Sequence, residues 1–192
     1  NLISYPSSSS TNISEAIPDD VEYLFEAILS AGGAAMNTGN GWVGSLMSFS
    51  GGSGYWVVVE EDLSFSYMLD GGLGRTAINK YVETLPEGVQ FSVIQSSQQA
   101  FYFVDQVELL DGAIEYGDWL LSYNGSVLTG IRQWQGITID VPAMGYNDLD
   151  ADTVGYFVKG DIPTFKLLKN STSELIELGG GVPEWTSNGV FT

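Results

Sequence analysis

The chain has 192 residues, 44% of them hydrophobic, which is enough for one large domain or two small ones with their own cores. Six basic residues against 24 acidic ones leave a formal net charge of −18, so nucleic acids and anionic membranes are poor partners. Cysteine and histidine are both absent, which excludes disulfides, thiolate metal sites and nucleophilic triads built on histidine.

The N-terminal part, residues 1–74, predicts a small α+β unit with one helix. Asp19 is a candidate N-cap with Glu22 three residues later, and Gly32 supplies a stop. The apolar stripe of this helix would be formed by Val21, Leu24, Phe25, Ile28 and Leu29. Runs rich in aromatic and β-branched residues then predict strands at 41–49, 55–60 and 63–68.

The C-terminal part, residues 86–192, predicts an antiparallel β-sandwich. Glycines at 71–74 indicate a domain boundary, residues 75–85 a connector, and residues 86–88 a turn. Asn124-Gly125 is the strongest hairpin signal, because both residues tolerate positive φ. Strands are predicted at 89–95, 100–110, 119–123, 127–134, 137–144, 153–158, 164–168 and 174–178. Short strands without intervening helices favour a sandwich, so the predicted fold class is mainly β.

Two groups of motifs resemble modules of large microbial extracellular and cell-surface proteins. The segments NLISYP (1–6), GWVGSL (41–46) and GYW (54–56) resemble a repeated module with the pattern GWNLISYP … GWVGSL … PGKGYW. The leading Gly-Trp is missing here, and Ser53 stands where that module often has lysine. This resemblance covers roughly the first 70 residues. Because the sequence starts without an initiator Met or a basic, apolar targeting segment, its numbering is expected to begin in a processed or excerpted chain.

A second resemblance lies in the C-terminal part. Residues 117–130, GDWLLSYNGSVLTG, are similar to the GDxIGAFxGDxCVGA segment of sandwich modules in microbial surface and sorted extracellular proteins. Residues 141–145 and 160–166 fit the same pattern, with Leu128 where the family often has cysteine. No catalytic residue carries over from either module, so the resemblance implies an architecture and an extracellular location, not a reaction.

An acidic loop is the candidate metal site. Asp148, Asp150 and Asp152 place carboxylates at alternate positions, as calcium loops do. The pattern is incomplete, because Lys159 stands at the twelfth position, where an EF-hand has a bidentate glutamate. Calcium is the candidate cofactor, and a solvated turn is the alternative reading.

Aromatic residues and glycosylation sequons are the other candidate sites. Trp42 and Trp56 lie beside glycines and are candidates for exposed sugar-stacking residues, whereas Trp119 and Trp134 lie in strand-like runs that favour the core. The sequons at Asn12 and Asn170 are candidate glycosylation sites, with chance occurrence as the alternative; the one at Asn124 falls in the predicted hairpin, a poor acceptor position.

The functional hypothesis is a non-enzymatic structural or adhesive module, located outside the cell or on its surface. The carboxylate pairs Glu60 with Asp62 and Asp111 with Asp118 flank turns, so no catalytic constellation is predicted. Partners would be other copies, surface proteins or glycans, with no membrane insertion. Assembly into a fibre by strand addition would use an unpaired N-terminal segment of Asn1, Leu2, Ile3, Ser4 and Tyr5, or the C-terminal stretch 184–192. The alternative is a carbohydrate-binding module that uses exposed Trp or Tyr.

Overall fold

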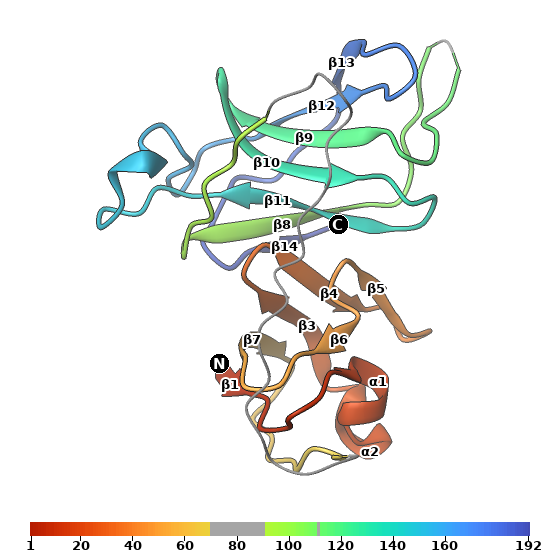
Figure 1. The fold of residues 1–192 in the computed structure, drawn as a ribbon, viewed down its shortest axis with the longest axis vertical. Helices are drawn as coiled ribbons and strands as arrows, with labels where there is room; N and C mark the ends of the chain where they lie inside the picture. Colours follow the sequence, from red (N-terminus) through yellow and green to blue (C-terminus); the bar gives the residue numbers. More distant parts are fainter. Residues whose placement is uncertain (70–90, 111) are drawn as a thin grey trace. The chain divides into compact units, whose positions relative to one another are not determined.

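The computed structural model in Figure 1 describes residues 1–69, 91–110 and 112–192. Strands make up 40% of the chain and helices 6%, and several of the sheets are antiparallel, so the predicted fold class, mainly β, is confirmed. The chain divides into two compact units, residues 1–81 and 82–192. The predicted boundary at 71–74, connector at 75–85 and turn at 86–88 lie outside the described residues.

The first unit is built on an antiparallel five-stranded sheet (Figure 1). Its order is β1 (Leu2–Ser4), β7 (Gly54–Val59), β3 (Phe25–Ser30), β4 (Gly33–Asn37) and β5 (Trp42–Gly44). A two-stranded ribbon joins β2 (Thr11–Asn12) to β6 (Ser48–Phe49). The helices α1 (Ile13–Ala16) and α2 (Asp19–Glu22) have four residues each, and no described helix is long and apolar enough to cross a membrane.

An aromatic cluster fills the core of the first unit. Tyr5 stacks on Phe49 with ring centroids 5.2 Å apart, and Tyr55 meets Phe49 edge-on at 4.8 Å. Phe65 and Tyr67 join this cluster from the predicted strand at 63–68, which is not a strand. That segment has alternating inward side chains, but it finds no backbone partner along a sheet edge.

The predicted helix over residues 19–29 is wrong beyond its first turn. Helix α2 ends at Glu22, and strand β3 begins at Phe25. This strand lies in the centre of the sheet, where Ile28 pairs with Val57 on one side and Ala35 on the other. Apolar residues on a central strand reproduced the spacing of a helical stripe, and pairing on both sides overrode it. Gly32, which was expected to stop the helix, belongs to the turn between β3 and β4.

The expectation of an unpaired N-terminal strand is also wrong. Strand β1 is already paired within the chain, with Leu2 opposite Trp56 and Ile3 opposite Tyr55. The α-amino group of Asn1 donates to the carbonyl of Val57 at 2.9 Å, and the Tyr5 side chain is fully buried. Residues 1–5 therefore complete the sheet of their own chain and do not depend on a strand from another copy.

The second unit holds two sheets (Figure 1). A four-stranded antiparallel sheet has the order β10 (Val127–Gln133), β9 (Trp119–Asn124), β12 (Thr164–Leu168) and β13 (Leu175–Leu178). A three-stranded sheet has the order β11 (Ile139–Met144), β8 (Gln99–Val104) and β14 (Val190–Phe191), and β14 runs parallel to β8. One core cluster takes side chains from both sheets, and Trp119 and Trp134 are buried as predicted. The sandwich arrangement itself stays a prediction.

Several predicted strands of the second unit are confirmed, and others are shorter or absent. Strand β12 has the predicted bounds, and β9 and β10 form the predicted hairpin. Because Asn124 pairs with Val127, the turn is Gly125-Ser126, one residue later than predicted, and Gly125 has φ 59°. Residues 91–95 form no strand, the predicted strand at 100–110 is limited to β8, and residues 153–158 hold only the end of η1 (Ala151–Thr153) and an isolated bridge. In the first unit, the predicted strand at 41–49 is interrupted between β5 and β6.

A buried polar seam joins β10 to β11. Arg132 donates from Nη2 to Asp140 Oδ2 at 2.9 Å and from Nε to the Asp140 carbonyl at 2.7 Å, and Asp140 is fully buried. Ser122 Oγ, from β9, donates to the Pro142 carbonyl at 2.7 Å. Gly130 lies so close to β11 that an added Cβ would stand 1.8 Å from the Pro142 oxygen. The seam therefore specifies which strands of the two sheets meet.

Candidate functional site

The sequence-predicted ligand residues Trp42 and Trp56 have different surroundings. Trp42 is only 9% exposed, and its indole Nε1 donates to Glu22 Oε1 at 2.5 Å. The expectation that Trp42 is exposed is therefore wrong, because the ring packs in the core of the first unit. Trp56 is 42% exposed on β7, opposite Leu2, which is also exposed. Of the two tryptophans, only Trp56 has a ring exposed enough for a ligand to contact.

The predicted calcium loop is held by its own backbone. Asp150 Oδ1 accepts from the Asp152 amide at 3.1 Å and caps η1, and Asn147 Oδ1 accepts from the Leu149 amide at 3.1 Å. Among the described residues, no group of three metal-ligating side chains is close enough to hold an ion. Calcium binding by Asp148, Asp150 and Asp152 stays a prediction of the sequence.

The candidate glycosylation sites lie on exposed turns and edges. Asn12 is exposed in β2, where its Oδ1 accepts from Ser48 Oγ at 3.2 Å, and Asn170 is exposed in the turn after β12. The amide of Asn124 instead donates to the Gly155 carbonyl and to Asp161. The first two side chains are accessible to a modifying enzyme, and the third is engaged within the fold.

The acidic residue Asp118 anchors loops of the second unit. Asp118 is 1% exposed and accepts hydrogen bonds of 2.9 Å from Lys169 Nζ, from the Glu115 amide and from the Asn170 amide. Lys169 Nζ also donates to the Ala113 carbonyl at 2.7 Å. The predicted partner at position 111 lies outside the described residues. This network ties residues 113–118 to the β12–β13 turn.

The network shifts the pKa values of both ion-pair partners. Burial raises the pKa of the Asp118 carboxyl, but the hydrogen bonds from Lys169 and two backbone amides outweigh burial, so this pKa lies below its ordinary value. The hydrogen bond to Asp118 raises the pKa of Lys169 above its ordinary value. Both shifts keep the pair charged, which suits a structural ion pair better than proton transfer.

Replacing Asp118 with asparagine is expected to lower the free energy of unfolding at neutral pH by about 1.5–3 kcal/mol, because charged hydrogen bonds are lost. The folded-state pKa of Asp118 is depressed, so its stabilisation is present above its unfolded value of about 4 and is lost as the pH falls through the folded value. Urea unfolding between about pH 7 and pH 3 would measure the free energy of unfolding of both proteins. The difference between the wild type and the variant should become smaller below about pH 4. A difference in free energy of unfolding that stays constant over this pH range would contradict a stabilising role for the charged Asp118 carboxylate.

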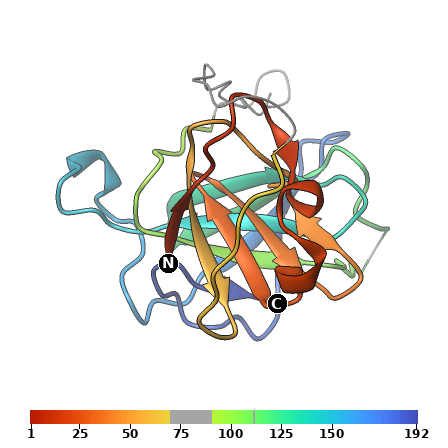
Figure 2. The ribbon, with the colours of Figure 1, turned by 90° about the horizontal axis from the view of Figure 1, so that it is seen from below.

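The projecting loop, residues 146–162 between β11 and β12, stands off from the strands of its unit in Figures 1 and 2. Its base is fixed, because the Tyr146 amide donates to the Phe157 carbonyl at 2.8 Å. Inside it, Thr153 is fully buried, and its Oγ1 donates to the Asp150 carbonyl at 2.7 Å. The loop is therefore an ordered element that can present side chains in fixed positions.

Large apolar side chains are exposed along this loop. Leu149 is 91% exposed, and four others are also exposed: Tyr146, Val154, Val158 and Ile162. Single exposed apolar residues are ordinary, but several on one ordered element indicate a contact surface. Sequence reasoning missed this surface, because the aspartates between these residues suggested a solvated turn.

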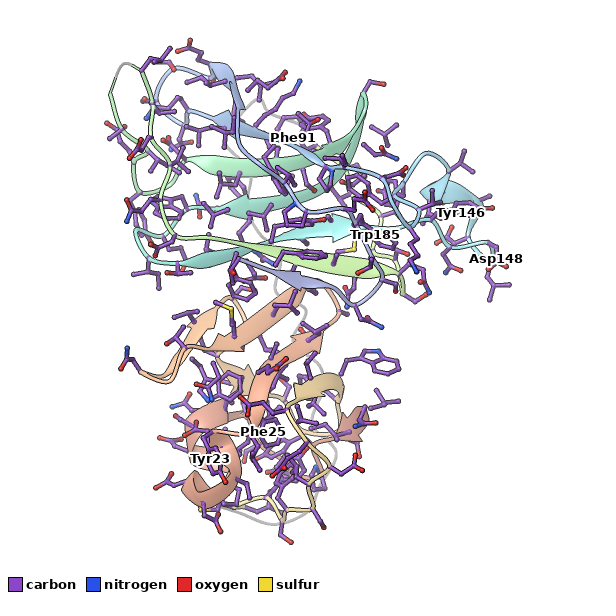
Figure 3. All side chains as sticks on the ribbon, turned by 180° about the vertical axis from the view of Figure 1, so that it is seen from behind. Tyr23, Phe25, Phe91, Tyr146, Asp148 and Trp185 are labelled. Atoms are coloured by element: carbon purple, nitrogen blue, oxygen red, sulfur yellow. The ribbon has the colours of Figure 1, made fainter. Side chains whose placement is uncertain are left out.

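A shallow hollow of about 430 Å³ lies at the base of the projecting loop. Its lining includes four residues of the loop, Tyr146, Phe157, Val158 and Lys159, and also Trp185. Trp185 is 3% exposed, stacks on Phe157 with ring centroids 6.2 Å apart and donates from Nε1 to the Ala143 carbonyl at 2.9 Å. In Figure 3, Trp185 lies beside the strands, while Tyr146 and Asp148 lie out along the loop. Gln98, Thr186 and Ser187 complete the lining.

No protein-family model, no curated protein and no solved structure matches this chain. The two motif resemblances to microbial surface modules therefore stay predictions.

Proposed function

We propose that this chain is a non-enzymatic structural or adhesive module of an extracellular surface, and that it associates with further copies of itself. The observation that carries this proposal is the ordered projecting loop with its exposed apolar side chains, Leu149 above all. Contact surfaces of this kind bury apolar side chains that an isolated molecule leaves in water. The motif resemblances to microbial surface modules support the same role.

Charge distribution sets the conditions for this association. The projecting loop carries four aspartates and one lysine, and the whole chain has a net charge of −18. Copies therefore repel one another over about 10 Å at 0.1 M salt. Because salt screens this repulsion without weakening apolar contact, association is expected to strengthen as the salt concentration rises.

Replacing Leu149 and Val154 with serine is expected to weaken self-association at least about fivefold, the factor that corresponds to the loss of about 1 kcal/mol of contact free energy from the pair. Sedimentation velocity at high salt would measure the change in association constant. Leu175→Ser is the matched control, since Leu175 is exposed on β13, away from the loop in sequence and sheet position. Equal association of the loop variant and the wild type would contradict a contact role for the loop.

The alternative function, carbohydrate binding, has one specific observation in its favour, the exposed ring of Trp56. A second stacking ring is lacking at Trp42, which is buried. Dose-dependent binding to a glycan array that disappears in Trp56→Ala would favour this alternative. Binding that Trp56→Ala leaves unchanged would remove it.

A further inference from the structure

We propose that the C-terminal tail, residues 182–192, exchanges between copies, so that the tail of one copy occupies the acceptor site of the next. The acceptor site is formed by the edge of β8 that β14 covers, by Gly145 and by Phe157. This inference rests on the self-association proposed above and names the segment that links the copies. It assigns the donor role to the C-terminal end, because the exposed glycines 179–181 precede that end and can act as a hinge.

The tail is anchored by one large side chain. The Trp185 ring lies close to the backbone of Gly145, where an added Cβ would stand 2.4 Å from two ring atoms. Its Nε1 donates to the Ala143 carbonyl, and its amide donates to the Asp161 carbonyl at 2.7 Å. A buried indole with a satisfied hydrogen bond is a typical anchor residue of a docked peptide.

The rest of the tail adds a short strand to a sheet edge. Strand β14 pairs in parallel with β8, with Val190 opposite Phe101. The Phe101 amide donates to the Gly189 carbonyl at 2.9 Å, and the ring of Phe191 stacks on Tyr102 with centroids 4.6 Å apart. Addition of a strand to an exposed edge is a general mode of peptide recognition.

These contacts do not depend on which copy supplies the tail. The tail residues named above meet strand β8, the end of β11 and the base of the projecting loop, all of which precede β12 in the chain. An exchanged tail would therefore make the same hydrogen bonds and ring contacts as a tail docked on its own copy. The exchanged and unexchanged forms therefore differ in free energy by three contributions only. These are the conformation of the joining segment, the entropy of association and the charge repulsion between copies.

The joining segment is suited to redirect the tail. Residues 179–181 are three consecutive glycines, all exposed, and an added Cβ at any of them would meet no atom within 4 Å. Gly180 has φ 149°, which side chains other than hydrogen rarely allow. Three extended residues span about 10 Å. The hinge glycines are exposed, so the backbone there can lead the tail back to its own acceptor site or away from it.

Charge allows the tail itself to cross between acidic copies. Glu184 is its only charged residue, so the segment that would enter the neighbour carries little of the net charge of −18. A tail on its own copy competes at an effective concentration on the order of millimolar. Exchange is therefore expected at high protein concentration and high salt, and it is favoured when the hinge is too short for the tail to reach its own site. A head-to-tail exchange that does not close on itself extends into a fibre.

The first test offers the 192-residue chain a fluorescent synthetic peptide of residues 182–192. After incubation just below the melting temperature, the peptide is expected to co-elute with the chain in size-exclusion chromatography, because it replaces the chain's own tail. The same peptide with Trp185→Ala is the matched control and should be retained at least about tenfold less. Equal retention of both peptides, or of neither, would overturn the proposed acceptor site.

The second test shortens the hinge in the full chain. Deletion of Gly180 and Gly181 is expected to shift the chain to dimers and larger species, which an excess of the unmodified peptide should dissolve. Insertion of further glycine and serine residues at the same place is the control and should keep the chain monomeric. If the shortened chain stays folded and monomeric, or its oligomers resist the peptide, tail exchange is wrong. Association that is lost in the loop variant but resists the peptide would then leave the proposed function standing without tail exchange.

Discussion

Replacing Asp140 with alanine is expected to lower the free energy of unfolding of the second unit by about 3–5 kcal/mol. Asp140 is fully buried, and it accepts a 2.9 Å hydrogen bond from Arg132, which is 6% exposed. Removal of Asp140 takes the carboxylate away from a guanidinium that is poorly exposed to water, and the loss of this counter-ion is the source of the cost. Guanidinium chloride unfolding, followed by tryptophan fluorescence, would measure the loss.

The double variant Arg132→Met with Asp140→Ala separates the cost of a stranded charge from the net contribution of the pair. It is expected to recover most of the stability lost in the single variant, because no unpaired charge remains. A double variant as unstable as Asp140→Ala would show that the packing of these side chains, and not the stranded charge, decides the effect.

Replacing Gly130 with alanine is expected to destabilise the second unit by about 3 kcal/mol or more, at the upper end of the range for overpacking. The added Cβ would stand 1.8 Å from the carbonyl oxygen of Pro142 and 2.6 Å from its carbonyl carbon. Backbone atoms cannot rotate away as a flexible side chain does, so β10 and β11 would have to separate. This separation would also disturb the hydrogen bond from Ser122 Oγ to the Pro142 carbonyl.

Gly179→Ala is the matched control for this substitution. An added Cβ at Gly179 would meet no atom within 4 Å, so a change of less than about 0.5 kcal/mol is expected. Thermal unfolding of the two variants beside the wild type would compare them directly. Similar melting temperatures for both variants would contradict the close approach of β10 and β11.

Local sequence patterns predicted some elements of the second unit correctly. Strand β12 and the β9–β10 hairpin follow from apolar runs and from the turn-forming residues Asn124 and Gly125. Strand β3 was misassigned because its burial depends on β7, about 30 residues further along the chain. The spacing of its apolar residues fits a helix and a buried strand equally, and only the long-range pairing decides between them.

The candidate site was less predictable than the fold, because exposure depends on what lies opposite a residue. The aspartates around Leu149 and Val154 indicate a solvated turn, but the sequence does not show that this turn is ordered and holds several exposed apolar side chains. Trp185 lies in a glycine-rich tail, but it is buried by Gly145, 40 residues earlier in the chain. Trp42 was misjudged for the same reason, since Glu22 and the first core enclose it.

The central claim, a surface module that self-associates, is tested most directly by sedimentation velocity of the unmodified chain over a range of protein and salt concentrations. The account predicts a reversible shift to larger species that strengthens with salt, because screening removes the repulsion between copies of net charge −18. A chain that remains monomeric at the highest protein and salt concentrations would contradict it.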